Sequence, residues 1–371
     1  VYFFRTMNQG HTGSFYSHAA AYLQIGISVL FRAIPLLMAL FCFGYGWFIT
    51  SYGTDPNRYV AGPVIFSLGM ICIALFSTAA TIIRQIIGTF GQVSKYTLPG
   101  IGYLSAVLTI IGGMHILHSS PDSASFVAGH VICGVGFITA CVATTATSST
   151  RFTMITENAQ KSDHDVPPKA FTRTQGLMLI SVAAILALTT WIWAFVLLSK
   201  SSLHPKYFVA GHVMIGLASI CTCLITLVAT IARQIRNIFS QTERKIWPVL
   251  VLVVGSLCII WGLILILGTA NMSLGSTGYI MIGLGLVCYS ISSKVILLSK
   301  IWRHEFKLSN RIPLIPIFTA LTCLFLSAFL FEIGSVHGYY FVPARVLAGL
   351  GGICFTLFSI VSILESGTSS H

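Results

Sequence analysis

The histidines of this chain are the side chains best suited to chemistry near neutral pH, since histidine changes charge between about pH 5 and 8. Six of the eleven lie near the ends of apolar segments, on the side that carries few basic residues: His115, His118, His130, His204, His212 and His337. Two of them, His130 and His212, follow the same Val-Ala-Gly tripeptide and so occupy equivalent positions. A short turn separates His115 from His130, and we expect these two side chains to lie close together.

Three interpretations of these histidines remain open. They can cap helix ends by bonding loop carbonyls, they can sense external acid, or they can bind a ligand such as haem or zinc. Metal-spaced His and Glu pairs are missing from the sequence, which makes the ligand interpretation the weakest. Glu332 and Arg345 are expected to face each other across another short turn. The candidate pH-sensing or ligand residues are therefore His115, His118, His130, His212, Glu332 and Arg345.

Catalytic signatures are absent from the sequence. There is no phosphate-binding loop, no nucleophile elbow and no pair of carboxylates within an apolar segment. All nine acidic residues stand at segment ends or in loops, whereas a proton-coupled carrier usually keeps one near the middle of the membrane. We expect no enzyme activity, no catalytic residue, no cofactor and no metal.

One pattern recurs five times along the chain, which indicates internal duplication. Its anchors, spaced 67, 82, 67 and 66 residues apart, are Gly62, Gly129, Gly211, Gly278 and Ala344. Fifteen residues after each anchor stands a hydroxyl: Ser77, Thr144, Thr226, Ser293 and Ser359. Positions five and seven after each anchor are small, as in Gly134 and Gly136. We expect this small-residue stripe to pack helices together. The alternative is that the hydroxyls line a water path through the bundle.

The elements that carry these residues are predicted to be membrane-spanning helices. The chain is 55% apolar and 8% charged, with a mean hydropathy of +0.87. Apolar stretches long enough to span a bilayer fall at about 33–50, 60–83, 99–117, 126–148, 176–198, 208–232, 247–269, 278–299, 312–333 and 344–364. The predicted fold class is an all-α polytopic membrane protein with ten transmembrane helices arranged as five tandem hairpin repeats.

The predicted organisation follows the repeats. It comprises an N-terminal extension (1–31), hairpins 1 and 2 (32–94 and 95–151), a linker (152–173), and hairpins 3 to 5 (174–243, 244–308 and 309–371). Sixteen basic residues map to one set of ends and four to the other, so both termini and the linker are predicted to be cytoplasmic. We expect Lys294 to extend toward that same side. The net charge of +12 thus reflects topology, and no nucleic-acid partner is predicted.

The ten cysteines lie within apolar spans and lack a C-x-x-C pair, so we interpret them as small core residues.

Three segments carry a resemblance to a known family: Phe208-Val-Ala-Gly-His-Val213, Asn310-Arg-Ile-Pro313 and the stretch 352–365. Through them the chain resembles the YhiM family of bacterial inner membrane proteins, from about Arg32 to Glu365. Members are multi-pass proteins associated with survival at low pH and lack an assigned biochemical activity. The resemblance implies a bacterial inner membrane location and a role in acid-stress tolerance, without a mechanism.

Two classes of function remain compatible with the sequence. The first is a pH-responsive sensor or scaffold that acts through an unidentified protein partner. The second is a channel or carrier for a small solute or ion through the bundle, and a haem- or metal-binding membrane protein is a weaker third. The bilayer itself is the one partner that composition alone predicts.

Overall fold

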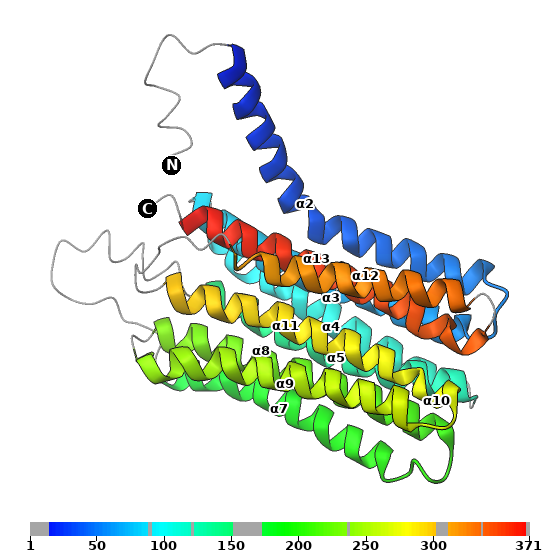
Figure 1. Cartoon of the computed structure of the whole chain (residues 1–371). Helices are drawn as coiled ribbons and strands as arrows, with labels where there is room; N and C mark the ends of the chain where they lie inside the picture. The colour runs from blue at the N-terminus through cyan, green and yellow to red at the C-terminus, as the bar shows by residue number, and fades with distance from the viewer. Residues whose placement is uncertain are drawn as a thin grey trace.

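Helices form all the regular structure of the described residues, which are 15–87, 91–119, 122–150, 173–235, 238–301, 311–334 and 337–368 of a computed structural model (Figure 1). The long helices are α2 (Phe15–Tyr52), α3 (Arg58–Ile87), α4 (Gln92–Ser119), α5 (Ser123–Thr150), α7 (Arg173–Leu198), α8 (Pro205–Ile235), α9 (Gln241–Gly268), α11 (Thr277–Ile301), α12 (Leu314–Gly334) and α13 (Phe341–Thr368). Two short elements, α10 (Met272–Gly275) and the 3₁₀ turn η2 (Gly338–Tyr340), precede α11 and α13.

Ten of these helices are long and apolar enough to cross a membrane, which confirms the predicted all-α polytopic class. The observed helices extend past the predicted spans where polar residues continue them into the interface. The helix α2 begins at Phe15, so the predicted boundary at residue 31 falls inside it. The predicted linker 152–173 lies outside the described residues except for Arg173.

The helices form two concentric layers. In α3, α5, α8, α11 and α13, which we call the inner helices, between 72% and 89% of the most apolar window is buried inside the protein. In α2, α4, α7, α9 and α12, the outer helices, the corresponding share is 22% to 33%. Each hairpin therefore supplies one outer helix and one inner helix, in that order along the chain.

The five inner helices close into a ring. Each contacts its neighbours in the order α3, α5, α8, α11, α13, and α13 returns to contact α3. Each outer helix lies in the groove between its own inner helix and that of the preceding hairpin; α2, the first, lies between α3 and α13. The last hairpin thus packs directly on the first.

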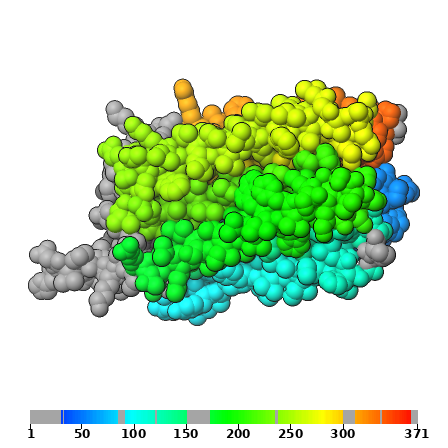
Figure 2. All heavy atoms as spheres, turned by 90° about the horizontal axis from the view of Figure 1, so that it is seen from below, coloured from blue at the N-terminus to red at the C-terminus, as the bar shows by residue number. Residues whose placement is uncertain are grey.

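The outer helices cover the sides of the molecule. Figure 2 shows one such side, formed by α4 in cyan, α7 in green and α9 in yellow-green. Large apolar side chains such as Leu104, Ile185 and Leu257 are exposed there. An apolar belt of this extent, on helices of spanning length, is the surface that lipid tails cover.

Small residues let neighbouring helices approach closely, both within the inner ring and between the two layers. Glycines five residues after the anchors face the leucine of the next inner helix: Gly134 faces Leu217, Gly216 faces Leu284, Gly283 faces Leu350 and Gly349 faces Leu68. Glycines seven residues after the anchors face the outer helix of their own hairpin: Gly69 faces Phe43, Gly136 faces Ile110, Gly285 faces Ile259 and Gly351 faces Leu324. Both sets are buried, as expected for packing surface. Equivalent contacts are what duplication of a hairpin would produce, and the duplication itself stays a prediction.

Candidate functional site

Two features could carry function: the first turns of the inner helices, where the equivalent histidines lie, and the axis that the inner helices enclose. His130 and His212 stand in the early turns of α5 and α8 and are only 8% and 5% exposed. The Nδ1 atom of each lies 2.7 Å and 2.8 Å from the carbonyl oxygen of Phe126 and Phe208, one turn earlier. A carbonyl only accepts, so Nδ1 donates in both bonds and fixes the ring orientation.

Each of these two histidines also contacts the next hairpin. The ring of His130 lies 5.7 Å from that of Trp193 on α7, and the ring of His212 lies 6.1 Å from that of Trp261 on α9. Outer helices α7 and α9 belong to the hairpins that follow. Both histidines therefore join neighbouring hairpins through a tryptophan, in a T-shaped contact for His130 and a stacked one for His212, which the sequence did not predict.

The other two candidate histidines, His115 and His118, do not contact His130 or His212 among the described residues. His115 and His118 are exposed at the end of α4, where the His118 ring bonds the Met114 carbonyl at 2.8 Å and His115 lies beside Ser119. His130 contacts Phe126 and Trp193, and the described residues show no contact of His115 with His130, which we expected to lie close together.

Arg345 is held by aromatic rings and by its own helix start. Its guanidinium carbon lies 3.4 Å from the centre of the Phe341 ring and 4.7 Å from that of Phe331, and Nη1 donates to the Phe341 carbonyl. Asp55, in the turn before α3, interacts with it electrostatically. Glu332 is exposed near the end of α12. Arg345 thereby joins the last hairpin to the first hairpin.

The five hydroxyls predicted as bundle-lining are buried, with exposures of 0% to 2%. Ser77, Thr144, Thr226 and Ser293 each donate to a carbonyl of the preceding turn. Ser359 donates to the Phe31 carbonyl on α2. Thr144 is also 3.1 Å from the Tyr103 hydroxyl on α4. Of the five, Ser359 and Thr144 thus contact an outer helix, and none of the five is among the residues that line the axial cavity.

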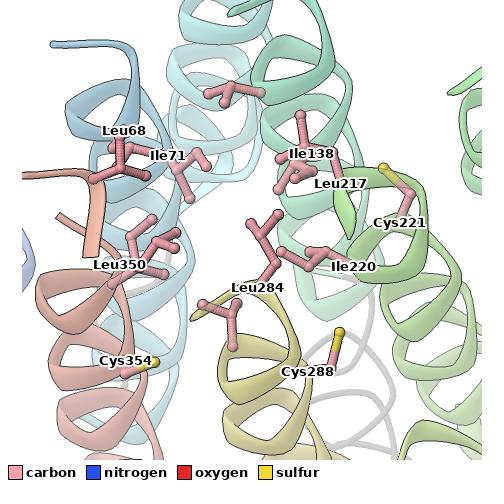
Figure 3. Close-up of a cluster of buried hydrophobic side chains, with 14 of the residues drawn as sticks. Leu68, Ile71, Ile138, Leu217, Ile220, Cys221, Leu284, Cys288, Leu350 and Cys354 are labelled. Carbon is pink, nitrogen blue, oxygen red and sulfur yellow. The ribbon is translucent and has the colours of Figure 1, made fainter. Parts of the chain in front are cut away.

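The axis is enclosed by apolar side chains from all five inner helices (Figure 3). We call the space between them the axial cavity; its volume is about 30 Å³, enough for one or two water molecules. Its lining recurs six, nine, thirteen and sixteen residues after the anchors: Leu68, Ile71, Leu75, Thr78, Ile138, Val142, Thr145, Leu217, Ile220, Leu224, Leu227, Leu284, Val287, Ile291, Lys294, Leu350, Ile353 and Leu357.

Lys294 is the charged member of this lining, and its observed position differs from the expectation that it extends to the cytoplasmic side. The side chain is 4% exposed and lines the axial cavity. Sixteen residues after the anchor, the inner helices carry Thr78, Thr145, Leu227, Lys294 and Ile360. The sequence could have indicated Lys294 as a candidate site residue, because an ionisable residue inside a membrane span is by default a functional candidate.

A second, larger space lies between hairpins 1 and 2. It measures about 290 Å³ and is lined by Pro63, Phe66, Leu108 and Gly112 among others. The helix α4 carries Gly112 one residue before Gly113, as α9 carries Trp261 one residue before Gly262. Gly112 thus stands where hairpin 4 places a tryptophan, and the crevice lies beside it.

The ten cysteines are free and buried, which agrees with their interpretation as core residues. Several lie beside a thiol of a neighbouring helix, as Cys72 of α3 does with Cys42 of α2. Among the described residues no group of three or more His, Cys, Asp or Glu side chains is arranged to hold a metal ion.

Comparison with known proteins decides the family. The profile of the family described as "Protein of unknown function (DUF2776)" matches residues 23–369. The chain belongs to this family. It is also 45% identical over 349 residues to the "Inner membrane protein YhiM" of Escherichia coli (strain K12), covering 94% of this chain and 99% of that protein. No solved structure matches. Together with the ten apolar helices, this family relationship identifies an inner membrane protein.

Proposed function

We propose that this protein is a closed conduit for a small solute or ion across the inner membrane, with no enzyme activity, and that it contributes to acid-stress tolerance. The observation that carries the proposal is the axial cavity, which five inner helices enclose away from lipid. Packing alone does not require the same face of every inner helix to point to the centre of the bundle. Here the positions six, nine, thirteen and sixteen residues after the anchors recur around the shared axis.

Apolar rings explain why such a conduit would be closed in this conformation. The leucines and isoleucines around the axis leave room for only one or two waters, so a hydrated ion is too large to pass the constriction in this conformation. Opening requires the inner helices to separate or rotate.

A polar substitution in the ring tests the conduit. Leu224 lines the axial cavity, whereas its neighbour Ile225 does not. We expect Leu224→Ser to let water into the constriction and to raise ion leakage from proteoliposomes several-fold. Ile225→Ser is the matched control and should leave leakage at the level of the parent. Equal leakage from the two variants would argue against an axial path.

A pH-responsive sensor or scaffold is the second candidate, supported by the contacts of His130 and His212 with Trp193 and Trp261. Protonation would place a charge on a ring that is at most 8% exposed and packed between hairpins. Burying an added charge is costly unless the surroundings rearrange. External acid could therefore loosen the contacts between hairpins 2, 3 and 4, and signal to a protein partner or open the axis.

Replacing both histidines tests this response. The double variant His130→Gln/His212→Gln keeps polar side chains of similar length and removes the titration. We expect survival of an acid challenge to fall toward that of cells lacking the protein, with normal membrane insertion. His118→Gln, at an exposed position, is the control and should survive as the parent does. Full protection by the double variant would show that the two histidines are structural.

A further inference from the structure

Lys294 is a buried cation with space beside it. Its side chain is 4% exposed within α11, and seven residues separate it from the helix end at Ile301, a rise of about 10 Å. It therefore lies within the membrane span. An ammonium group in this environment is costly unless a partner of opposite charge or a set of hydrogen bonds compensates it.

The described residues supply no such partner. No hydrogen bond or ion pair of the Lys294 amino group is formed with any of them, and the remaining lining of the axial cavity holds no carboxylate. The four described acidic side chains, Asp55, Asp122, Glu243 and Glu332, lie at helix ends or in turns. Lys294 therefore lines an enclosed space and has no counter-charge among the described side chains.

Two threonines stand across the axis from Lys294. Thr78 of α3 and Thr145 of α5 line the same cavity and stand at the equivalent position, sixteen residues after their anchors. The ring order places α11 opposite the adjacent pair α3 and α5. The lysine and the two threonines therefore enclose the cytoplasmic part of the axis from opposite sides, with Leu227 and Ile360 between them.

We propose that Lys294, Thr78 and Thr145 form a binding site for one small inorganic anion of about the size of chloride. The ammonium supplies the charge, and the hydroxyls supply hydrogen bonds. Each hydroxyl now donates to a carbonyl one turn earlier, at 3.0 Å and 3.1 Å, and turning toward an anion exchanges that bond for a charge-assisted one. A cavity of about 30 Å³ selects against carboxylates and phosphates by size.

The site can be tested by binding to the purified full-length protein in detergent. Thermal unfolding is measured in chloride or bromide and in gluconate, at equal pH and ionic strength. We expect chloride and bromide to raise the unfolding midpoint saturably, by about 3–5 °C at a concentration about a hundredfold above the dissociation constant. Gluconate is too large for the cavity and should give no shift.

Two lysine variants assign the effect. Lys294→Met removes the charge at similar length and should abolish the shift, while unfolding in gluconate at a temperature no lower than the parent, since a buried charge is gone. Lys206→Met, near the Phe126 ring at the outer end, is the matched control and should keep the shift. Equal midpoints of the parent in chloride and gluconate would overturn the proposal. So would a saturable shift that survives Lys294→Met.

The hydroxyls are tested by the double variant Thr78→Val/Thr145→Val, which preserves shape. We expect the affinity for bromide to fall about tenfold or more; unchanged affinity would contradict their contact with the anion. Binding is measured without any transport. A protein that binds bromide yet gives no axial leakage retains this site and refutes the conduit, and the converse result refutes the site alone.

Discussion

At the scale of single residues, burial decides which polar groups can respond to their surroundings. His130 and Lys294 are both almost enclosed, but His130 contacts a carbonyl and a tryptophan, while Lys294 lines the small axial cavity. His118, by contrast, is exposed near the end of α4. A change in external pH reaches the exposed residue at once, and reaches the enclosed ones only when neighbouring helices move.

Asp122 gives a pH-dependent prediction at this scale. Hydrogen bonds from the side chain and backbone of Ser125 hold the pKa of the Asp122 carboxyl below its ordinary value, at the start of α5. A lowered pKa in the folded state means that the carboxylate stabilises the protein at pH values above the unfolded pKa of about 3.9. That contribution is lost as the pH falls through the lower folded pKa.

The corresponding variant is Asp122→Ala. We expect its unfolding midpoint at pH 7 to lie about 1 °C below that of the parent, because the residue is exposed and caps one helix. The difference should persist at pH 5 and shrink below about pH 3.5, which calorimetry in detergent would measure. A difference that grows on acidification would show that the carboxylate does not act as its charged form.

At the scale of elements, the close contact of α4 with α5 depends on which face of the helix a glycine occupies. A methyl group on Gly113 would come within 2.9 Å of the Gly129 carbonyl oxygen and 2.7 Å of the Cys133 sulfur. On the adjacent Gly112 it would meet nothing within 4 Å, because the crevice between hairpins 1 and 2 is there. The two neighbours share a helix and differ only in what they face.

This pair makes a matched experiment. We expect Gly113→Ala to lower the free energy of unfolding by about 1–3 kcal/mol, since a backbone carbonyl cannot move aside cheaply. Gly112→Ala should be neutral or stabilising by up to about 1 kcal/mol, through helix propensity. Chemical unfolding of the two variants in mixed micelles compares them. Equal destabilisation would mean that the interhelical contact at Gly113 is not close in solution.

The layered arrangement shows what the sequence could and could not predict. Long apolar stretches predict the spans, because backbone groups in lipid must be satisfied within helices. Small residues at repeated offsets predict close packing, and Gly216 and Gly283 are indeed buried against leucines. The sequence could not predict which hydroxyls line the axis, because consecutive helix positions point about 100° apart. Thr145 lines the axial cavity, whereas its neighbour Thr144 does not.

Contacts between distant segments were beyond the reach of sequence reasoning. The tryptophan partners of the histidines lie on the following hairpins, 63 residues from His130 to Trp193 and 49 from His212 to Trp261. Nothing in either local sequence specifies that pairing. The position of Lys294 depends likewise on the rotation of α11 about its own axis, which the neighbouring inner helices determine.

At the scale of the whole molecule, charge asymmetry predicts orientation. The inner helices end on the side that carries Arg84, Arg233 and Lys300, and the turns at the other side carry few basic residues. We expect a reporter fused after Glu365 to read cytoplasmic and one inserted beside Asp122 to read periplasmic. A paired alkaline phosphatase and fluorescent protein fusion at each site measures this. The reverse pattern would show that the termini are periplasmic.

Closure of the ring also has a consequence for biosynthesis. The contact of Gly349 with Leu68 joins the last hairpin to the first, so an arc of four hairpins exposes two unpartnered helix faces until the fifth emerges from the ribosome. Chains that stop after α11 would present these faces to quality-control proteases. We therefore expect truncated chains to be degraded faster than complete ones.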